Sequence, residues 1–469
     1  MVSTRPSAIQ TAPSSLQYLE TGGSDSPNQR ILPLTAEVNS QDHLVVGGCD
    51  VLDLVHEFGS PLYILDELTL RTACRQYRQA FERYYPGNSL VMYASKAWNC
   101  LAVCAIAAQE GLAIDVVSGG ELLTALSAGV EPSNLYFHGN NKSHQELQRG
   151  LDAGCRIVVD NWHELRTLSL LAGADMPATI LLRLTPGIEC HTHEYIRTGH
   201  IDSKFGFDPD QLEAVFAYIA QQPGLNCIGL LAYIGYQIFE LQPHQDLSAV
   251  LVGWMETAKR YGLPISELDV GGGLGIRYTE TDDPPSIDGW AQVVCHNMVQ
   301  ACQTANVPLP RLICEPGRSL IGSACVTVYT VGSQKTVPGI RTYMSVDGGM
   351  SDNPRPITYQ SVYRVLAAGK MSAPLSETVT LAGKHCESGD VIIHDAQLPL
   401  LESGDLVAVP ATGAYNYSMA SNYNRVPRPA AVLVNAGQAA LIVERETEAD
   451  LMRYDRLPSY LKIWGQSLS

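Results

Sequence analysis

The stretch VMYASKAWNC at residues 91–100 indicates how the surrounding chain folds. Its first residues, Val91 to Tyr93, are apolar and β-prone, as in a buried strand. The run Leu101–Ala108 that follows is apolar, mostly small and helical in character. Lys96 lies between them, and burial there should lower the pKa of its amine and make it nucleophilic, as a Schiff-base lysine requires. The alternative is a lysine that extends to the surface at a strand end.

Short apolar runs recur along the chain and alternate with segments of helical pattern. Strands that alternate with helices pair in parallel through right-handed crossovers. Eight such units predict a (β/α)8 TIM-like barrel over residues 62–325, rather than an open sheet. The predicted strands are Leu90–Tyr93, Ala113–Val117, Leu135–Phe137, Arg156–Val159, Ile180–Leu184, Ile228–Ile234, Glu267–Val270 and Leu312–Cys314.

Polar residues and glycines lie at or just past the carboxyl ends of these predicted strands. A barrel collects such residues on one face, and this face carries the catalytic groups. The residues at these positions are Lys96, Ser118, His138, Asp160, Arg183, Gly271–Gly273 and Glu315. The spacing therefore predicts one site at the carboxyl face of the barrel.

The pattern changes after Ala324 to short, β-branched runs separated by turn signals. These runs predict an antiparallel β-rich second domain over residues 326–469. The segment 44–61 is expected to pack on that domain. Residues 1–43 are predicted to be a disordered extension, because the first thirty residues are rich in Ser, Thr, Pro and Gly; a transit peptide is the alternative.

Composition narrows the class of protein. The 469-residue chain has a net charge of −17, which argues against nucleic acid or an anionic membrane as a partner. Its twelve cysteines have no paired spacing, and several lie inside apolar runs, as reduced thiols of a cytoplasmic protein do. No segment has the length and purity of a transmembrane helix. The expected partner is a small molecule.

Two motifs at the ends of neighbouring predicted strands suit a phosphorylated ligand. The turn DVGGGLG at residues 269–275 allows the backbone to approach a ligand and donate N–H groups to a phosphate. The alternative is a tight turn between a strand and a helix. The motif Glu315-Pro316-Gly317-Arg318 places a carboxylate and a guanidinium three residues apart. A carboxylate can pair with a protonated pyridine nitrogen, and an arginine can bind a phosphate or a carboxylate.

Two further motifs contain possible acid–base groups or ligands. In the second domain, Cys386 and Glu387 follow a histidine, and a thiol in this setting could transfer a proton. The alternative is a turn with an incidental thiol. The segment CHTH at residues 190–193 has the residue types of a zinc site, but no second ligand pair has matching spacing, so no metal is predicted.

Five ordered motifs resemble those of a known family over residues 48–445. The motifs are Ala94-Ser95-Lys96, Gly271–Gly273, Glu315–Arg318, Cys386-Glu387-Ser388 and Gly413-Ala414-Tyr415. They are similar to motifs of the fold-type III pyridoxal-phosphate decarboxylases and, within them, of the diaminopimelate decarboxylases. The segment RPITY at residues 355–359 favours diaminopimelate over ornithine as the substrate. The resemblance implies decarboxylation of meso-2,6-diaminopimelate to L-lysine and CO2, the last step of lysine biosynthesis.

The resemblance also implies roles for individual residues. The resemblance implies pyridoxal 5'-phosphate as the cofactor. It also implies that Lys96 is the Schiff-base lysine and that Cys386 is a proton donor. Cofactor contacts are expected from Gly271, Gly272, Gly273, Glu315, Pro316, Gly317, Arg318 and Tyr415. Substrate contacts are expected from Arg318, Arg355, Tyr359, Glu387 and Tyr415. A homodimer with shared active sites follows from the same resemblance, as does a mobile cover formed by residues 187–204.

One segment departs from the family pattern. Where the family reads His-x-His-Ile-Gly-Ser-Gln, this chain has Leu231, Tyr233 and Tyr236 in place of the two histidines and the serine. A tyrosine at position 233 can still stack on a cofactor ring. A phenol at position 236 replaces a small hydroxyl group at the phosphate, so reduced cofactor binding and activity are expected. The alternatives are a related decarboxylase of another basic amino acid or polyamine precursor, and a catalytically degenerate cofactor-binding homologue.

Overall fold

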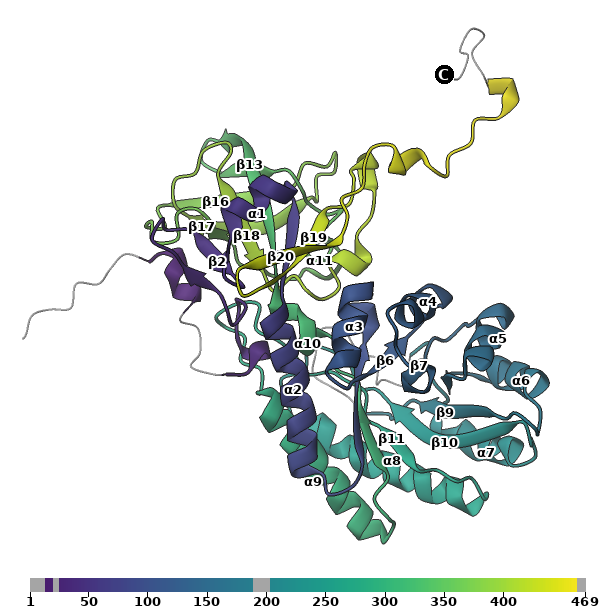
Figure 1. Ribbon diagram of the computed structural model, residues 1–469. Coiled ribbons are helices and arrows are strands. Elements are labelled where there is room, and N and C mark those ends of the chain that lie inside the picture. The colour runs from purple at the N-terminus through teal and green to yellow at the C-terminus, as the bar shows by residue number, and fades with distance from the viewer. Residues whose placement is uncertain (1–12, 20–24, 189–202, 462–469) are drawn as a thin grey trace, which may run out of the picture.

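Eight parallel strands close into a barrel in the computed structural model, which describes residues 13–19, 25–188 and 203–461 (Figure 1). Around the barrel the order is β10-β11-β12-β5-β6-β7-β8-β9. The strands are β5 Ser89–Ala94, β6 Ala113–Val116, β7 Leu135–Phe137, β8 Arg156–Val159, β9 Ala178–Leu184, β10 Leu225–Ala232, β11 Glu267–Asp269 and β12 Arg311–Cys314. The predicted barrel is therefore confirmed, strand by strand.

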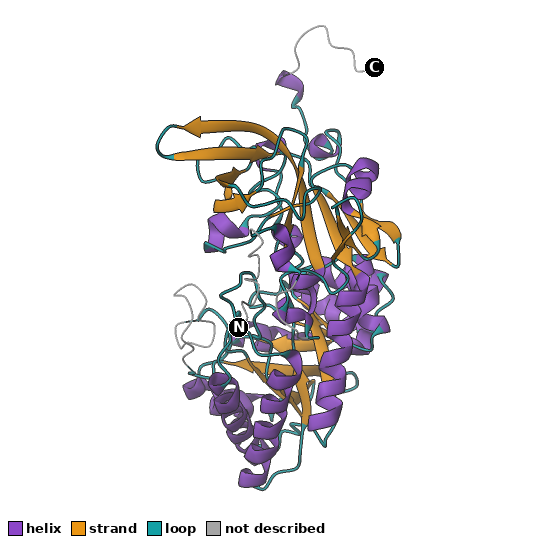
Figure 2. Cartoon of the chain, turned by 90° about the vertical axis from the view of Figure 1, so that its left-hand side faces the viewer, coloured by secondary structure: helices purple, strands orange, loops and turns teal. Residues whose placement is uncertain are grey.

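Helices cover the outside of this barrel, as Figure 2 shows in purple. They are α2 Glu67–Tyr84, α3 Leu101–Gln109, α4 Gly119–Ser127, α5 His144–Ala153, α6 Trp162–Leu171, α7 Leu212–Ile219, α8 Gln242–Arg260, α9 Ile287–Ala305 and the short α10 Arg318–Ile321. Several begin at a side-chain cap that accepts a backbone N–H, which satisfies a donor otherwise unpaired at the helix start. Ser118 caps α4, Ser143 forms a capping box on α5, and Asn161 caps α6.

The barrel interior is filled by apolar side chains that point inward from successive strands. Met92, Tyr136, Val158, Leu181 and Ile313 form part of one buried cluster there. Such a layer is a packed core and not a pore. Groups that follow the strand ends therefore lie above a closed floor of apolar side chains.

The second body is a nine-stranded sheet with segments from both ends of the chain. Its elements are β4 Leu62–Asp66, β13 Cys325–Val337, β14 Arg341–Val346, β15 Leu366–Ala367, β16 Glu377–Ala382, β17 Val391–Leu398, β18 Leu406–Pro410, β19 Ala430–Asn435 and β20 Gln438–Val443, with α11 Arg355–Tyr359. The β-rich architecture was predicted, but β4 was not placed in it. The expectation of a purely antiparallel sheet is wrong, because β14 pairs with β16, and β19 with β4, in parallel.

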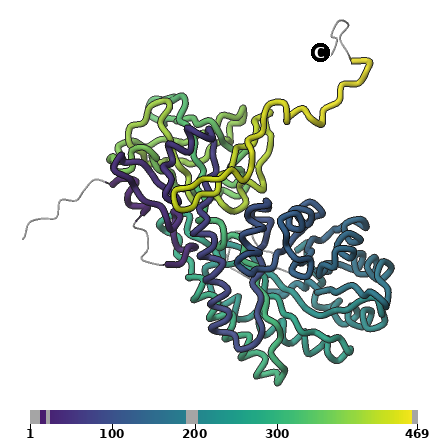
Figure 3. The backbone as a smooth tube through the Cα atoms, viewed as in Figure 1, coloured from purple at the N-terminus to yellow at the C-terminus, as the bar shows by residue number. Residues whose placement is uncertain are grey.

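The segment before β4 packs on this second body, where purple and yellow-green segments lie together in Figure 3. It contains the small sheet β1 Glu37–Val38, β2 Leu44–Val46 and β3 Cys49–Asp50, followed by α1 Val51–Phe58. Ile31 and Leu32 are buried in the same cluster as strand residues of β4 and β13. The prediction of a disordered extension over residues 1–43 is therefore wrong for its described part. A few apolar residues in this mostly polar sequence, such as Ile31 and Leu32, pack into the core of the second body.

The two bodies meet at the turn that follows β5. The carbonyl oxygen of Ala97 accepts hydrogen bonds from the backbone N–H of Tyr415, at 2.9 Å, and from the Ser418 hydroxyl, at 3.0 Å. The Trp98 ring stacks on that of Tyr417 with 5.4 Å between centroids. The second body therefore fixes the segment next to Lys96. Among the described residues, no helix is long and apolar enough to cross a membrane.

Candidate active site

A cavity of about 500 Å³ opens at the carboxyl face of the barrel, below the second body. Its size suits a small-molecule ligand. The lining residues are Lys96, Asp115, Val117, His138, Gly139, Asn140, Arg183, Phe205, Leu231, Tyr233, Tyr236, Glu315, Arg318, Arg355, Tyr359, Tyr415 and Met419. The prediction of a single site at the strand ends is therefore matched by a real concavity.

Lys96 lies in a 3-10 turn, Ser95–Ala97, directly after β5. Its side chain reaches solvent through the cavity, although protein atoms surround it on the other sides. Burial acts to lower the pKa of Lys96, but the Asp115 carboxylate, together with Tyr233, Tyr415 and Glu315, raises the pKa above its ordinary value. The predicted lowering of this pKa is wrong in direction, because the sequence pattern showed the apolar strand and not the acidic neighbours.

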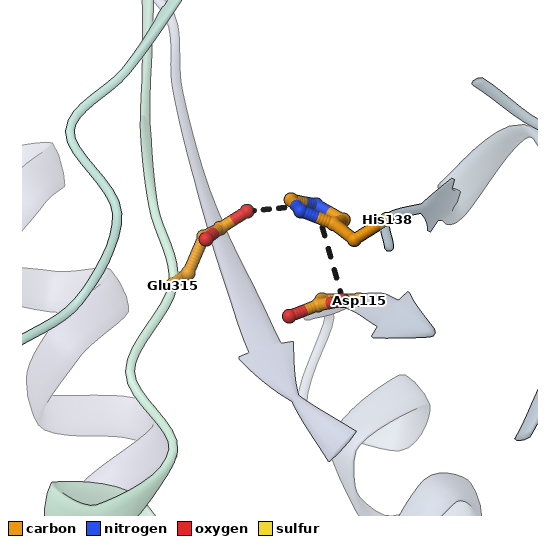
Figure 4. A group of neighbouring side chains, drawn as sticks. All are labelled: Asp115, His138 and Glu315. Atoms are coloured by element: carbon orange, nitrogen blue, oxygen red, sulfur yellow. Dashed lines mark ion pairs between the residues drawn. The ribbon is translucent and has the colours of Figure 1, made fainter. Parts of the chain in front are cut away.

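Glu315, His138 and Asp115 form a buried cluster from three different strand ends (Figure 4). His138 Nε2 lies 2.9 Å from Glu315 Oε1 and 3.9 Å from Asp115 Oδ1. Burial acts to raise the pKa of Glu315, but His138 lowers it to about 2. Burial acts to lower the pKa of His138, and the two carboxylates raise it above its ordinary value. The geometry therefore favours an ionised Glu315 beside a protonated imidazole.

A glycine loop runs beside Glu315, and two hydrogen bonds of Gly271 hold it in place. The Glu315 N–H donates to the carbonyl of Gly271 at 2.8 Å, and the Gly271 N–H donates to Asp269 Oδ1 at 2.8 Å. A Cβ on Gly272 would lie 2.3 Å from the Glu315 carbonyl oxygen, and Gly273 has a φ of +117°. Only glycine allows this close approach and this backbone conformation. The loop thus leaves its backbone next to Glu315 and Arg318.

Arg318 is the buried first residue of α10, and aromatic rings surround its guanidinium. The carbon of the guanidinium lies 4.9 Å from the centroid of Tyr415, 5.4 Å from that of Tyr236 and 5.8 Å from that of Tyr278. Arg318 also donates a hydrogen bond to the Tyr278 hydroxyl. This arrangement stabilises a cation by interaction with ring faces and keeps it directed toward the cavity.

A second buried arginine enters the cavity from the other body. Arg355, at the start of α11, donates from Nε to the Tyr363 hydroxyl at 3.0 Å and from a terminal nitrogen to Ser361 at 3.2 Å. Burial acts to lower its pKa, but the neighbouring tyrosines Tyr278 and Tyr363 raise it. Arg355 and Tyr359 therefore present a cation and a hydroxyl group to the side of the cavity opposite the barrel strands.

The departures at positions 231, 233 and 236 occupy different places. Leu231 belongs to the apolar interior of the barrel and is 1% exposed. The Tyr233 ring lies against Gly271, with its centroid 5.5 Å from Lys96 Nζ. Tyr236 is half-buried and lies over Arg318. The structure thus places Leu231 in the floor of the cavity and both tyrosines along its wall.

Most predicted site residues come together, and some do not. Lys96, Glu315, Arg318, Arg355, Tyr359 and Tyr415 line the cavity, and Gly273 and Gly317 line a recess that adjoins it. Cys386 and Glu387 are exposed on the second body and are absent from the described lining of this chain. Ser118 serves as a helix cap instead. Most of the expected cover at 187–204, including the segment at 190–193, lies outside the described residues.

Several lining residues were not predicted. Asp115 lies inside the apolar strand β6, and an acid in such a strand is the signal that could have identified it. Asn140 and Phe205 lie in loops, Met419 ends the short 3-10 helix Tyr417–Met419, and none of the three belongs to a motif. Their place at the cavity depends on the closure of the barrel and on the docking of the second body, which local sequence does not encode.

Comparison with known proteins agrees with this geometry. The model of the family "Pyridoxal-dependent decarboxylase, pyridoxal binding domain" matches residues 68–322. A diaminopimelate decarboxylase of Synechocystis sp. is 64% identical over 452 residues, which cover 94% of this chain and 96% of that protein. The corresponding protein of Bacillus subtilis is 44% identical, with 90% of this chain and 97% of that protein covered.

Solved structures show the same fold. The diaminopimelate decarboxylase of M. jannaschii in complex with L-lysine superposes with a TM-score of 0.86 at 31% identity, covering 93% of this chain and all of that one. That of Helicobacter pylori, also complexed with L-lysine, gives a TM-score of 0.78 at 30% identity, with 86% of this chain and 98% of that one covered. With these matches and a site of this composition, the chain belongs to the diaminopimelate decarboxylase family of the pyridoxal-dependent decarboxylases.

Proposed function

We propose that this chain removes carbon dioxide from meso-2,6-diaminopimelate to give L-lysine, with pyridoxal 5'-phosphate as the cofactor. The observation that carries the proposal is the cavity that unites Lys96 with the Glu315–His138 pair and with two buried arginines. A 64% identical diaminopimelate decarboxylase supports the same substrate over ornithine or arginine. A purely degenerate homologue would have no reason to keep this set of charged groups buried at one cavity.

The residues present fit the ring and the linkage of the cofactor. Lys96 offers an amine to the cavity, and Glu315 offers a buried carboxylate nearby. The glycine loop packs so closely on the Glu315 backbone that a Cβ at position 272 would lie 2.3 Å from its carbonyl oxygen, and Gly273 of this loop lines the recess beside the cavity. We assign cofactor binding to Lys96, Gly271–Gly273, Glu315–Arg318 and Tyr415, with Arg318 as the cation for the phosphate.

Glu315 and His138 set the charge at one end of the cavity. Because Glu315 stays ionised, its carboxylate can accept a hydrogen bond from a protonated pyridine nitrogen. When bound, the cofactor accepts the electron pair that departing carbon dioxide leaves behind. His138, which also lines the cavity, compensates the buried negative charge and fixes the carboxylate in place.

Arg355 and Tyr359 act on the substrate's other end. A guanidinium can hold a carboxylate by two parallel hydrogen bonds, and diaminopimelate has a second carboxylate that ornithine lacks. We therefore assign recognition of this distal carboxylate to Arg355, with help from Arg318, Tyr359 and Tyr415. This assignment explains why a buried arginine, held by Tyr363 and Ser361, faces the cavity from the second body.

Cys386 and Glu387 complete the proposed site from another subunit. Both are exposed on the second body of this chain, and neither belongs to the described lining of its own cavity. We infer a cytoplasmic homodimer in which Cys386 of one subunit delivers the proton to the reacting carbon in the other. Glu387 is assigned to the substrate's distal ammonium group. A two-fold arrangement supplies both sites equally.

The direct test is an assay of the purified chain with saturating pyridoxal phosphate. We expect release of carbon dioxide and formation of L-lysine from meso-diaminopimelate, with rates at least about 100-fold lower for ornithine, arginine and lysine, which lack the distal carboxylate. The Lys96→Ala variant is the control and should be inactive. Equal rates for ornithine and diaminopimelate would contradict the assigned substrate.

A further inference from the structure

A small recess adjoins the main cavity at the side where Arg318 lies. Lys96, Tyr233, Tyr236, Gly273, Gly317 and Arg318 are among its lining residues. Its volume is about 20 Å³, which corresponds to about one water molecule. The phosphate group of a cofactor has a phosphorus atom and three terminal oxygens, so it needs several times this space. The recess has the right donors for an anion and too little room for it.

Three tyrosines line the recess, namely Tyr233, Tyr236 and Tyr415. Tyr233 is held against the glycine loop, since a Cβ on Gly271 would lie 2.7 Å from its ring. Tyr236 lies at the mouth, half-buried, with its ring centroid 5.4 Å from the Arg318 guanidinium. The Tyr236 ring, like the Tyr415 ring at 4.9 Å, therefore lies next to the cation that is best placed to meet a phosphate. At this position the chain has a phenol where the family has a serine, so the ring takes up space that a serine would leave free.

We propose that Tyr236 is an affinity-determining residue in this chain: its ring occupies the phosphate position beside Arg318, and it must turn aside before the cofactor can bind. The inference rests on the proposed cofactor and concerns only how tightly this chain holds it. Turning aside gives up the contact between the ring and the guanidinium, and it crowds the main cavity. Both costs weaken binding of a phosphorylated ligand.

The effect is specific to the phosphate end of the ligand. Pyridoxal has the same ring and aldehyde but no phosphate, so it does not require the recess. Removing the Tyr236 ring should therefore strengthen binding of pyridoxal phosphate and leave pyridoxal unchanged. A phenylalanine at this position keeps the ring and loses only the hydroxyl group, so it should bind pyridoxal phosphate as weakly as the unmodified chain.

The experiment compares the unmodified chain with Tyr236→Ser, Tyr236→Ala and Tyr236→Phe after removal of cofactor. Each protein is titrated with pyridoxal phosphate and, separately, with pyridoxal, and binding is read from the visible absorbance of the lysine-bound ligand. We expect Kd for pyridoxal phosphate to fall about 10-fold or more in the Ser and Ala variants, since relief of overpacking is of this order. Kd for pyridoxal should stay within about twofold in all four proteins.

A matched control removes a different ring from the same cavity. Tyr359→Ser takes away a phenol that lines the main cavity but not the recess, so cofactor affinity should not improve. The inference is overturned if Tyr236→Ser binds pyridoxal phosphate no better than the unmodified chain, if pyridoxal gains equally, or if the Phe variant gains as much as the Ser variant. Absence of any absorbance change in all variants would instead refute the cofactor assignment, and the inference with it.

Discussion

Lys96 and Lys142 both lie near the carboxyl ends of the strands, but their surroundings give them different roles. Lys96 faces the cavity, where burial is outweighed by Asp115 and other acidic or phenolic groups that raise its pKa. Burial lowers the pKa of Lys142, whose ammonium is enclosed by Glu164 and two backbone carbonyls. Access to the cavity, and not burial alone, distinguishes a reactive lysine from a structural one.

Lys96 should therefore be the lysine that bonds to the cofactor. Borohydride reduction of the loaded protein, followed by peptide mass mapping, is expected to place the adduct on Lys96. The buried Lys142 serves as an internal control and should remain unmodified. An adduct on any lysine other than Lys96 would contradict the assignment.

His138 should stabilise the cofactor-free protein in a pH-dependent way. Because its pKa is raised in the folded state, its contribution is complete below about pH 6.5 and is lost as pH rises through the raised pKa. Glu315, with a pKa lowered to about 2, remains ionised throughout this range. Replacing His138 by Gln should cost about 1–3 kcal/mol of unfolding free energy at pH 5.5, and less at pH 9.

Urea unfolding of the two proteins at pH 5.5, 7 and 9 measures this difference. His163→Gln, an exposed histidine on α6, is the matched control and should show no comparable pH-dependent loss. A stability difference between the chain and His138→Gln that grows with pH would show that His138 does not act as the buried cation.

At the scale of elements, a buried ion pair joins the loop after β7 to α6. Lys142 Nζ lies 2.5 Å from Glu164 Oε1 and also donates to the carbonyls of Gly139, at 2.7 Å, and Val158, at 2.9 Å. Gly139 belongs to the loop that lines the cavity. The pair thus links a cavity loop to the end of β8 and to a helix.

Removing only one charge of this pair should be more harmful than removing both. Lys142→Met leaves Glu164 buried and unpaired, which should cost about 3–5 kcal/mol. The double variant Lys142→Met/Glu164→Gln keeps the hydrogen bond that the Glu164 side chain accepts from the Asp160 N–H, so it should recover part of this loss. Thermal unfolding of both variants and of Glu164→Gln completes a double-mutant cycle. Equal losses of stability in Lys142→Met and in the double variant would contradict a stabilising interaction between the two charges.

Most helices and strands could be predicted from the sequence, whereas several strand pairings and side-chain contacts could not. Apolar runs of three to seven residues identified all barrel strands, because each is buried on both faces and alternates with a helix. β4 has the same composition, Leu62–Asp66, and yet lies in the other body. Its partners are more than 200 residues away in the chain, so local pattern gave no signal. The Asp115–His138 contact and the parallel pair β14–β16 join residues closer in the chain, and they depend on how neighbouring strands are arranged, which local pattern does not encode.

At the scale of the whole molecule, the exposed Cys386 and the cavity-facing Lys96 should cooperate only between subunits. Lys96→Ala and Cys386→Ala should each lose at least about 100-fold in activity. When the two inactive proteins are mixed and allowed to exchange, half of the dimers combine both types and contain one intact site. Activity should then return to about one quarter of that of the unmodified chain.

A control for this mixing experiment is the double variant Lys96→Ala/Cys386→Ala. Mixed with the unmodified chain, it should lower activity below simple dilution, since each mixed dimer contains no intact site. If energy transfer between subunits that carry different fluorescent labels shows that they exchange, and the two single variants still stay inactive together, the shared-site proposal is wrong.

The position of β4 has a consequence for the order in which the protein forms during synthesis. β4 lies between β13 and β19, so both of its hydrogen-bonding edges wait for segments made much later. All strands of the barrel, up to β12, are synthesised before either partner. A nascent chain therefore carries β4 as a strand with two open edges, a form prone to pairing with other chains. Completion of the last strands, at residues 430–443, ends this exposure only when almost the entire polypeptide has left the ribosome.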